Sequence, residues 1–189
     1  MPEVIAVQEF GNQLTVLFDD NTKKIAYPTS GGLWLVKTQP TVTPDLWRWP
    51  LDDHAGMHVS SEWDDGRGHT GIDLNFTGIA GTPIYAISDG FVVGKGFYSA
   101  GNGHVVKLSA IDGSYYDFQH MQSATTLESG DPVSKGDFIG SVGSSGDFAT
   151  GPHLHFATSN TGWSGVQPNF ASTVNPRDFM AARGVPIPW

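Results

Sequence analysis

The sequence predicts a mainly β fold, and three features of its composition support this. The chain of 189 residues contains 24 glycines, aromatic residues make up 12% of it, and charged residues make up 15%. An average domain has about 7% glycine and about 25% charged residues. Because aromatic side chains favour strands and glycines favour tight turns, we expect short strands joined by turns.

Residues 1–38 are predicted to form a small N-terminal β unit. Four strand-like runs cover residues 4–10, 13–18, 23–27 and 33–37. Turn-forming residues separate them, namely Gly11-Asn12, Asp19-Asp20-Asn21 and Thr29-Ser30-Gly31-Gly32. Such runs with short turns between them indicate a meander of three or four strands.

Residues 39–67 are predicted to be a connecting segment packed on a larger core. Prolines interrupt it and apolar periodicity is lost. It also carries the tryptophans Trp47, Trp49 and Trp63. We expect these rings to hold the segment against apolar surface of the next unit.

Residues 68–189 alternate strands and turns again and are predicted to form the main domain. The expected strands cover residues 72–76, 82–88, 90–98, 104–110, 114–121, 137–143 and 153–159. One short helix is expected near the end, with Asn175 as its cap, Pro176 at its first position and Gly184 after it.

Charge and composition exclude several classes of function. A net charge of −9 makes the chain a poor candidate for binding nucleic acid. The absence of cysteine excludes disulfides, thiol nucleophiles and Cys-ligated metal sites. No apolar stretch reaches the ~20 residues of a membrane span, so no membrane insertion is expected. The first residues also lack the basic and apolar regions of a secretory signal.

Two histidines two residues apart are the first candidate for chemistry. His153 and His155 flank Leu154 in a predicted strand, where residues two apart point to the same face. The alternative is a strand whose polar face carries two solvated histidines. A functional pair is the favoured interpretation.

A second motif offers further metal ligands. His69 and Asp73 lie in a stretch that reads as a loop running into a strand. A turn with a local hydrogen bond would explain this motif alone equally well. Together with one of His153 and His155, however, it supplies three ligands, the number that a catalytic zinc requires. The remaining histidine would then lie near the metal, where a general base belongs.

Four other histidines are weaker candidates. Strand alternation places His120 on one face with Tyr116 and Phe118, and a half-buried strand histidine is the alternative. His104 begins a predicted strand at a hairpin and is expected to be solvated. The i, i+4 pair of His54 and His58 gives a weak indication of a second metal site.

The order of several motifs resembles one known family. The segments GHTGIDL, GTPIYAISDGFVV, YYDFQHM and SGDPVSKGDFIGSVGSSGDFATGPHLHF resemble the lysostaphin-type zinc endopeptidases, which cleave peptide bonds in bacterial peptidoglycan. The resemblance runs from about Gly68 to Pro176. It implies an antiparallel β-sheet metallopeptidase core with one zinc ion in an open groove.

The resemblance also assigns roles to individual residues. It implies that His69, Asp73 and His155 are the zinc ligands and that His120 and His153 are the catalytic pair. Two positions depart from the family pattern. Ala157 stands where an acidic residue is frequent, and Phe118 replaces a tyrosine. Neither departure changes a metal ligand, and both concern the groups that surround the ligands and the substrate preference.

The expected function is that of a zinc-dependent endopeptidase acting on stem peptides or cross-bridges of peptidoglycan. The alternative is a catalytically degenerate module that serves as a binding or structural component, for example of a phage tail. The missing signal favours a phage source, either as an endolysin released through a holin or as a lysin carried on the virion. Phage particle components are therefore expected as further partners beside peptidoglycan peptides.

Overall fold

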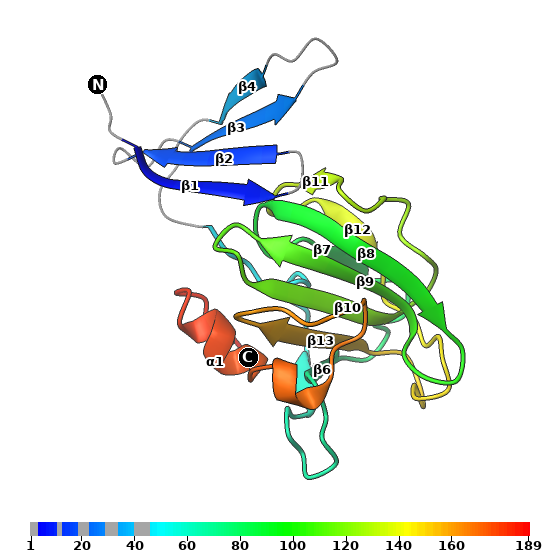
Figure 1. The fold of residues 1–189 in the computed structure, drawn as a ribbon. Helices are drawn as coiled ribbons and strands as arrows, with labels where there is room; N and C mark the ends of the chain where they lie inside the picture. The colour runs from blue at the N-terminus through cyan, green and yellow to red at the C-terminus, as the bar shows by residue number, and fades with distance from the viewer. Residues whose placement is uncertain (1–3, 11–12, 19–22, 29–33, 40–45) are drawn as a thin grey trace. The chain divides into compact units, whose positions relative to one another are not determined.

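The computed structural model describes residues 4–10, 13–18, 23–28, 34–39 and 46–189 (Figure 1). By the contacts between Cα atoms, the chain divides into two compact units, Met1–Asp45 and Leu46–Trp189. We describe each unit separately.

The first unit is a four-stranded antiparallel sheet in the order β1-β2-β3-β4. Its strands are β1 (Val4–Phe10), β2 (Gln13–Phe18), β3 (Lys23–Pro28) and β4 (Trp34–Gln39). Each strand pairs with the next one along the chain, which is the meander that the four strand-like runs predict.

The second unit is built on a seven-stranded sheet in the order β11-β8-β9-β10-β13-β6-β5 (Figure 1). Its strands are β5 (His58–Ser61), β6 (Ile72–Asn75), β8 (Gly90–Tyr98), β9 (Gly103–Ala110), β10 (Tyr115–Met121), β11 (Pro132–Val133) and β13 (Leu154–Ser159). A separate pair joins β7 (Pro83–Tyr85) to β12 (Phe138–Ser141). All of these strand pairs are antiparallel, which confirms the predicted fold class.

Two strands of this sheet lie where no strand was expected. β5 falls in the Pro- and Trp-rich segment, and its residues alternate between exposed and half-buried without an apolar face. β5 is therefore held in place by its pairing with β6, in which Val59 lies opposite Leu74, and not by burial of an apolar face. β11 has only two residues, too few for a periodic pattern to show.

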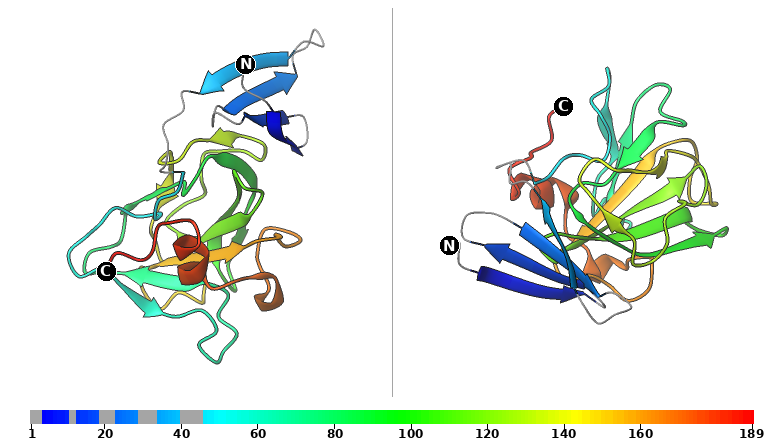
Figure 2. Two further views of the ribbon diagram at one scale, coloured as in Figure 1. Left: turned by 90° about the vertical axis from the view of Figure 1, so that its left-hand side faces the viewer. Right: turned by 90° about the horizontal axis from the view of Figure 1, so that it is seen from above.

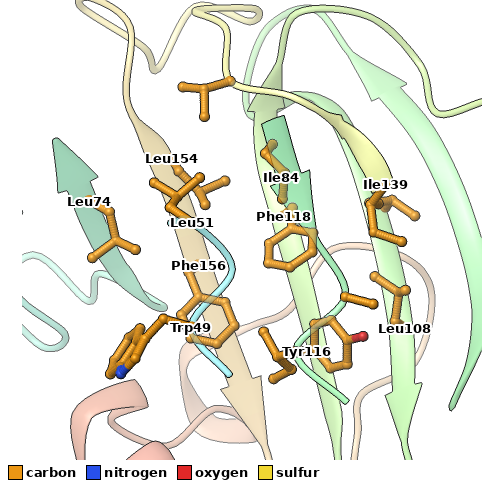
Figure 3. Packing of buried hydrophobic residues seen from close by; sticks show 14 of the residues in the cluster. Trp49, Leu51, Leu74, Ile84, Leu108, Tyr116, Phe118, Ile139, Leu154 and Phe156 are labelled. Carbon is orange, nitrogen blue, oxygen red and sulfur yellow. The ribbon is translucent and has the colours of Figure 1, made fainter. Parts of the chain in front are cut away.

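The core of the second unit joins residues from the large sheet, the β7–β12 pair, the C-terminal helix and the segment that precedes β5 (Figure 3). Trp49 and Leu51 from that segment face Leu154 and Phe156 of β13. The rings of Trp49 and Phe156 meet edge to face, with centroids 6.0 Å apart. Burial of large aromatic and aliphatic side chains is the main stabilising term in a sheet of this kind.

The helix α1 (Pro176–Ala181) covers β13 (Figure 2). The Asn175 side chain accepts a hydrogen bond from the backbone N–H of Arg177 at 2.9 Å, and Pro176 stands at the first turn. These are the cap and the start that the sequence predicts. A 3-10 turn, η1 (Phe170–Ser172), precedes it.

Within the described residues, no helix has the length and apolar character needed to cross a membrane.

A bulge in β10 overturns one expectation about His120. Its φ angle is 57°, in the left-handed region, and the pairing of β10 with β9 shifts between Phe118 and Met121. The expected shared face of Tyr116, Phe118 and His120 is therefore wrong. Met121 instead returns to the core and is fully buried. The extra residue interrupts the alternation, so the His120 side chain is still buried but lies beside His153 and outside the apolar cluster.

Candidate active site

Three side chains, from the loop before β6, from β6 and from β13, form a group that could hold a metal ion. His69, Asp73 and His155 each offer one ligand atom, and these atoms lie within 4.8 Å of one another. The Asp73 Oδ1 atom is 3.0 Å from His155 Nδ1 and 3.2 Å from His69 Nε2. The antiparallel pairing of β6 with β13 sets Asp73 directly opposite His155. These are the three residues that the family resemblance implied.

Gly71 allows His69 to approach β13 closely. A Cβ atom at this position would lie 2.3 Å from the backbone oxygen of Phe156 and 2.9 Å from His155 Nε2. Any larger residue would therefore push the loop carrying His69 away from the strand carrying His155.

Contacts behind the two histidines orient their rings. His69 Nδ1 donates to the backbone oxygen of Glu62 at 2.8 Å, and His155 Nε2 lies 3.2 Å from the Thr70 hydroxyl oxygen. The Glu62 carboxylate is held in turn by Arg177 of α1. Such partners leave His69 Nε2 and His155 Nδ1, the two nitrogens nearest Asp73, available as ligands.

Electrostatics in the metal-free chain keep Asp73 ionised. Burial raises the pKa of its carboxyl, but the hydrogen bonds from His155 and His69 outweigh this and hold the pKa well below its ordinary value. Burial lowers the pKa of His155. One carboxylate oxygen and two imidazole nitrogens are a donor set that suits zinc, and three protein ligands leave a coordination position open.

Two further histidines lie beside this group. The rings of His120 and His153 are 4.8 Å apart, and His153 Nε2 is 3.7 Å from Asp73 Oδ1. The ring of His120 is also 6.2 Å from that of His155. The structure thus brings together all five residues to which the family resemblance assigns roles.

Both of these histidines have the same hydrogen-bonding arrangement. His120 Nδ1 donates to the backbone oxygen of Ser145 at 2.8 Å, and His153 Nδ1 donates to that of Gly151 at 2.9 Å. A carbonyl only accepts, so Nδ1 carries the hydrogen and Nε2 is the nitrogen free to accept a proton. Burial lowers the pKa of His120 to about 4, so its ring is neutral near neutral pH.

The remaining histidines lie outside this site. His54 stacks on Phe76 with ring centroids 4.3 Å apart, and His58 Nδ1 donates to the backbone oxygen of Gly56. In the described part of the chain, the group of His69, Asp73 and His155 is the one placed to hold a metal, and neither His54 nor His58 joins it.

His104, which was expected to be solvated, is half-buried. Its Nδ1 is buried without a hydrogen-bond partner, and its ring lies 4.5 Å from that of Phe97. The cause is a contact distant in sequence, because the Ser145 hydroxyl accepts from the His104 backbone N–H at 2.9 Å. A docked loop therefore covers a strand end that looks open in the sequence.

The two departures from the family pattern lie in different environments. Phe118 is fully buried and packs against Phe156, with ring centroids 5.8 Å apart. Ala157 pairs with Asp117 across β13 and β10. Asp117 is itself fully buried, and its Oδ2 accepts a hydrogen bond from Gln119 at 2.9 Å.

Sequence reasoning missed Thr70, Glu62 and Ser145, which hold the site histidines. Glu62 and Ser145 act on these histidines through backbone carbonyl oxygens, which carry no side-chain signal. Thr70 stands inside the His69–Asp73 motif, so its position was the one available clue.

Comparison with known proteins supports the same family. The sequence profile of peptidase family M23 matches residues 67–168. The glycyl-glycine endopeptidase ALE-1 of Staphylococcus capitis is 38% identical over 92 residues, which are 49% of this chain and 25% of that protein. Lysostaphin of Staphylococcus simulans is 36% identical over 108 residues, 57% of this chain and 19% of that protein. The chain thus spans a quarter or less of the length of these relatives.

A solved structure agrees with these matches. The catalytic domain of lysostaphin from Staphylococcus simulans aligns with a TM-score of 0.54 and 30% identity, over 66% of this chain and 90% of that domain. The profile match covers more than half of the chain and includes all five site residues. The chain therefore belongs to peptidase family M23, and its His–Asp–His group fits the single zinc ion of a metallopeptidase.

Proposed function

We propose that this chain is a zinc-dependent endopeptidase that hydrolyses peptide bonds in the stem peptides or cross-bridges of bacterial peptidoglycan. In this proposal His69, Asp73 and His155 bind the zinc ion, and His120 and His153 are the catalytic residues. One observation carries it: a three-ligand group lies directly beside two histidines whose Nε2 atoms are free to accept a proton.

The zinc ion, when bound, would act as a Lewis acid that polarises a scissile carbonyl and acidifies a water molecule. The residues of the chain would supply the proton transfers. His120 or His153 accepts the proton of the attacking water through Nε2. The other takes a proton from solvent before the substrate binds, donates a hydrogen bond from Nε2 to the oxygen on which negative charge develops, and keeps this proton through the turnover. The proton taken from water then passes to the leaving amine, so protons balance over one turnover.

The names of the relatives support a peptidoglycan substrate. One relative is a glycyl-glycine endopeptidase and another is lysostaphin. The match to the family model, residues 67–168, falls on the unit that carries the site. We therefore propose the same class of substrate, with the cross-bridge as the first bond to examine.

The test is digestion of purified peptidoglycans that differ in their cross-bridges, with the released fragments identified by mass spectrometry. We expect new amino termini at one type of bond. His120→Ala and His153→Ala should retain zinc and lose roughly 10²–10⁴-fold in rate, the usual contribution of a positioned acid–base group. The control is His58→Ala, which removes an exposed histidine outside the site. If the zinc-loaded protein cleaves none of the peptidoglycans, the proposal is refuted.

The degenerate alternative predicts that one or more of these positions is filled by an unsuitable residue. All three ligand positions and both catalytic positions carry suitable side chains, which supports the enzyme instead. The phage source and its particle components rest on the sequence alone and stay a prediction.

A further inference from the structure

We propose that Ser145 is a positioning residue for the two catalytic histidines. Its hydroxyl anchors the turn formed by residues 143–146, and the backbone of this turn fixes the tautomer of His120 and the location of His153. The inference rests on the proposed function for its kinetic consequences. Its structural consequence, the tautomer of His120, can be measured without any substrate.

The Ser145 hydroxyl joins the turn to two neighbouring strands. It donates to the backbone oxygen of Met121 in β10 at 2.6 Å and accepts from the backbone N–H of His104 in β9 at 2.9 Å. The register of these two strands shifts at the bulge beside His120, and their pairing resumes with Met121 opposite His104. The hydroxyl therefore ties together the backbone of the two strands at the point where pairing resumes after the bulge.

The backbone of the same residue holds His120. The Ser145 oxygen accepts from His120 Nδ1 at 2.8 Å, and the Ser145 N–H points to the His120 oxygen at 3.4 Å. The backbone N–H of His120 donates to Asn102 at 2.9 Å. These contacts surround a residue in the left-handed region, which is uncommon outside glycine. Such a conformation persists where neighbouring contacts enforce it.

The turn also reaches the second catalytic histidine. The backbone N–H of His153 donates to the Gly143 oxygen at 3.3 Å, and these two residues form an isolated β-bridge. A Cβ atom on Gly143 would lie 2.4 Å from the Gln122 nitrogen. The turn is thus packed tightly against the end of β10 at one side and against the start of β13 at the other.

The chemical consequence concerns the nitrogen that accepts the proton. With Nδ1–H held by the Ser145 oxygen, the lone pair of neutral His120 lies on Nε2. If the turn moves away, the hydrogen can shift to Nε2, and a ring in that tautomer cannot accept a proton there. Displacements of about 1 Å in catalytic groups can reduce rates by as much as 10²-fold.

The chain provides a matched control next to Ser145. Ser144 has the same side chain in the same turn but is exposed, whereas Ser145 is half-buried and bonded on both sides. Both Ser145→Ala and Ser144→Ala remove a hydroxyl, but only Ser145→Ala also removes the hydrogen bonds to His104 and Met121. Ser145→Thr keeps the hydroxyl and serves as the rescue.

The experiment measures kcat, KM, zinc content and the ¹⁵N chemical shifts of the imidazole of His120 in the zinc-loaded protein. For Ser145→Ala we expect zinc content to stay at the wild-type level, KM to change less than about twofold, and kcat to fall roughly 10- to 100-fold. The ¹⁵N shifts should show a loss of the pure Nδ1–H tautomer. Ser144→Ala should match wild type in all four readouts, and Ser145→Thr should restore the tautomer and most of kcat.

The outcomes separate this inference from the proposed function. If wild type cleaves no peptidoglycan, the proposed function fails, and the ¹⁵N shifts still decide the role of Ser145. If Ser145→Ala keeps the wild-type tautomer, or loses no more activity than Ser144→Ala, the inference is overturned. If Ser145→Ala does not fold, Ser145→Cys retains a side chain of similar size with a weaker donor. An unchanged tautomer in that variant overturns the inference equally.

Discussion

Among the three proposed ligands, His155 is the one that lies in a fully buried strand, where it pairs with Gln119 on one side and with Asp73 on the other. We predict that His155→Ala abolishes stoichiometric zinc binding. Two ligands, His69 and Asp73, would remain, one fewer than a catalytic zinc site uses. Elemental analysis of the purified variant measures this, with His58→Ala as the control. A zinc content of about one per chain in His155→Ala would show that this ligand is wrongly assigned.

His120 should make the stability of the metal-free protein depend on pH. Burial lowers its pKa to about 4 in the folded chain, against an ordinary value of 6.5. Between these values the unfolded chain binds the proton and the folded chain does not, so the contribution of His120 to stability is lost as pH falls from 6.5 to 4. The full effect is about 3 kcal/mol in the free energy of unfolding.

The measurement is urea unfolding of chelator-treated protein at pH 7 and at pH 4, compared with His120→Asn. Asparagine tolerates the left-handed backbone of this position and does not titrate. Wild type should lose more stability than the variant on acidification. Equal losses in the two proteins would contradict the low pKa of His120.

The grouping of the proposed site residues could be predicted from the sequence, but their orientation could not. Motif order placed His69, Asp73 and His155 together, and the structure brings their ligand atoms within 4.8 Å. The position of His120 depends on a bulge, which strand alternation does not show. The role of Ser145 depends on hydrogen bonds across 24 and 25 residues of chain, to Met121 and His120. A local pattern carries no information about contacts of that kind.

The turn between β8 and β9, together with the first residue of β9, packs against Ser145, and this close packing limits which side chains fit there. Gly103 has a φ angle of 65°, and a Cβ atom there would lie 2.2 Å from the Ser145 oxygen. We predict that Gly103→Ala lowers the free energy of unfolding by about 2 kcal/mol or more, because left-handed strain adds to a backbone clash. Denaturant unfolding measures this.

Gly101 in the same turn is the matched control. The nearest atom to a Cβ at Gly101 would be 3.8 Å away, an ordinary contact. Gly101→Ala should therefore change stability by less than about 0.5 kcal/mol. Similar losses in the two variants would mean that the turn moves freely and does not press on the loop of Ser145.

Most elements were predicted because glycine turns and apolar alternation are local signals. The seven expected strands of the second unit correspond to β6, β7, β8, β9, β10, β12 and β13. β5 was missed because tertiary pairing, rather than an apolar face, holds it in the sheet. The short helix was predicted in type and start because Asn175 and Pro176 are specific N-terminal signals.

The division of the whole chain leads to a prediction about the first unit. The residues of the proposed site and of the buried core cluster all lie within Leu46–Trp189. We predict that a shortened protein of residues 46–189 folds, binds zinc and cleaves small muropeptides at a rate close to that of the full chain. Rates on intact cell walls should fall if residues 1–38 serve targeting.

The measurement compares zinc content and muropeptide cleavage of the two proteins, with wall digestion run in parallel. A folded, zinc-loaded short protein that does not cleave small muropeptides would show that the first unit completes the site.

The two ends of the second unit are fastened to each other. The Trp49 indole N–H donates to the backbone oxygens of Val185 and Pro186 at 3.1 and 3.2 Å, and its ring meets that of Trp189 with centroids 5.5 Å apart. Because its two ends lie close together, such a domain can be inserted within another protein without distortion of its own backbone. The stretches of ALE-1 and lysostaphin that match this chain are about a quarter and a fifth of those longer proteins, so related sequence stands there among other sequence.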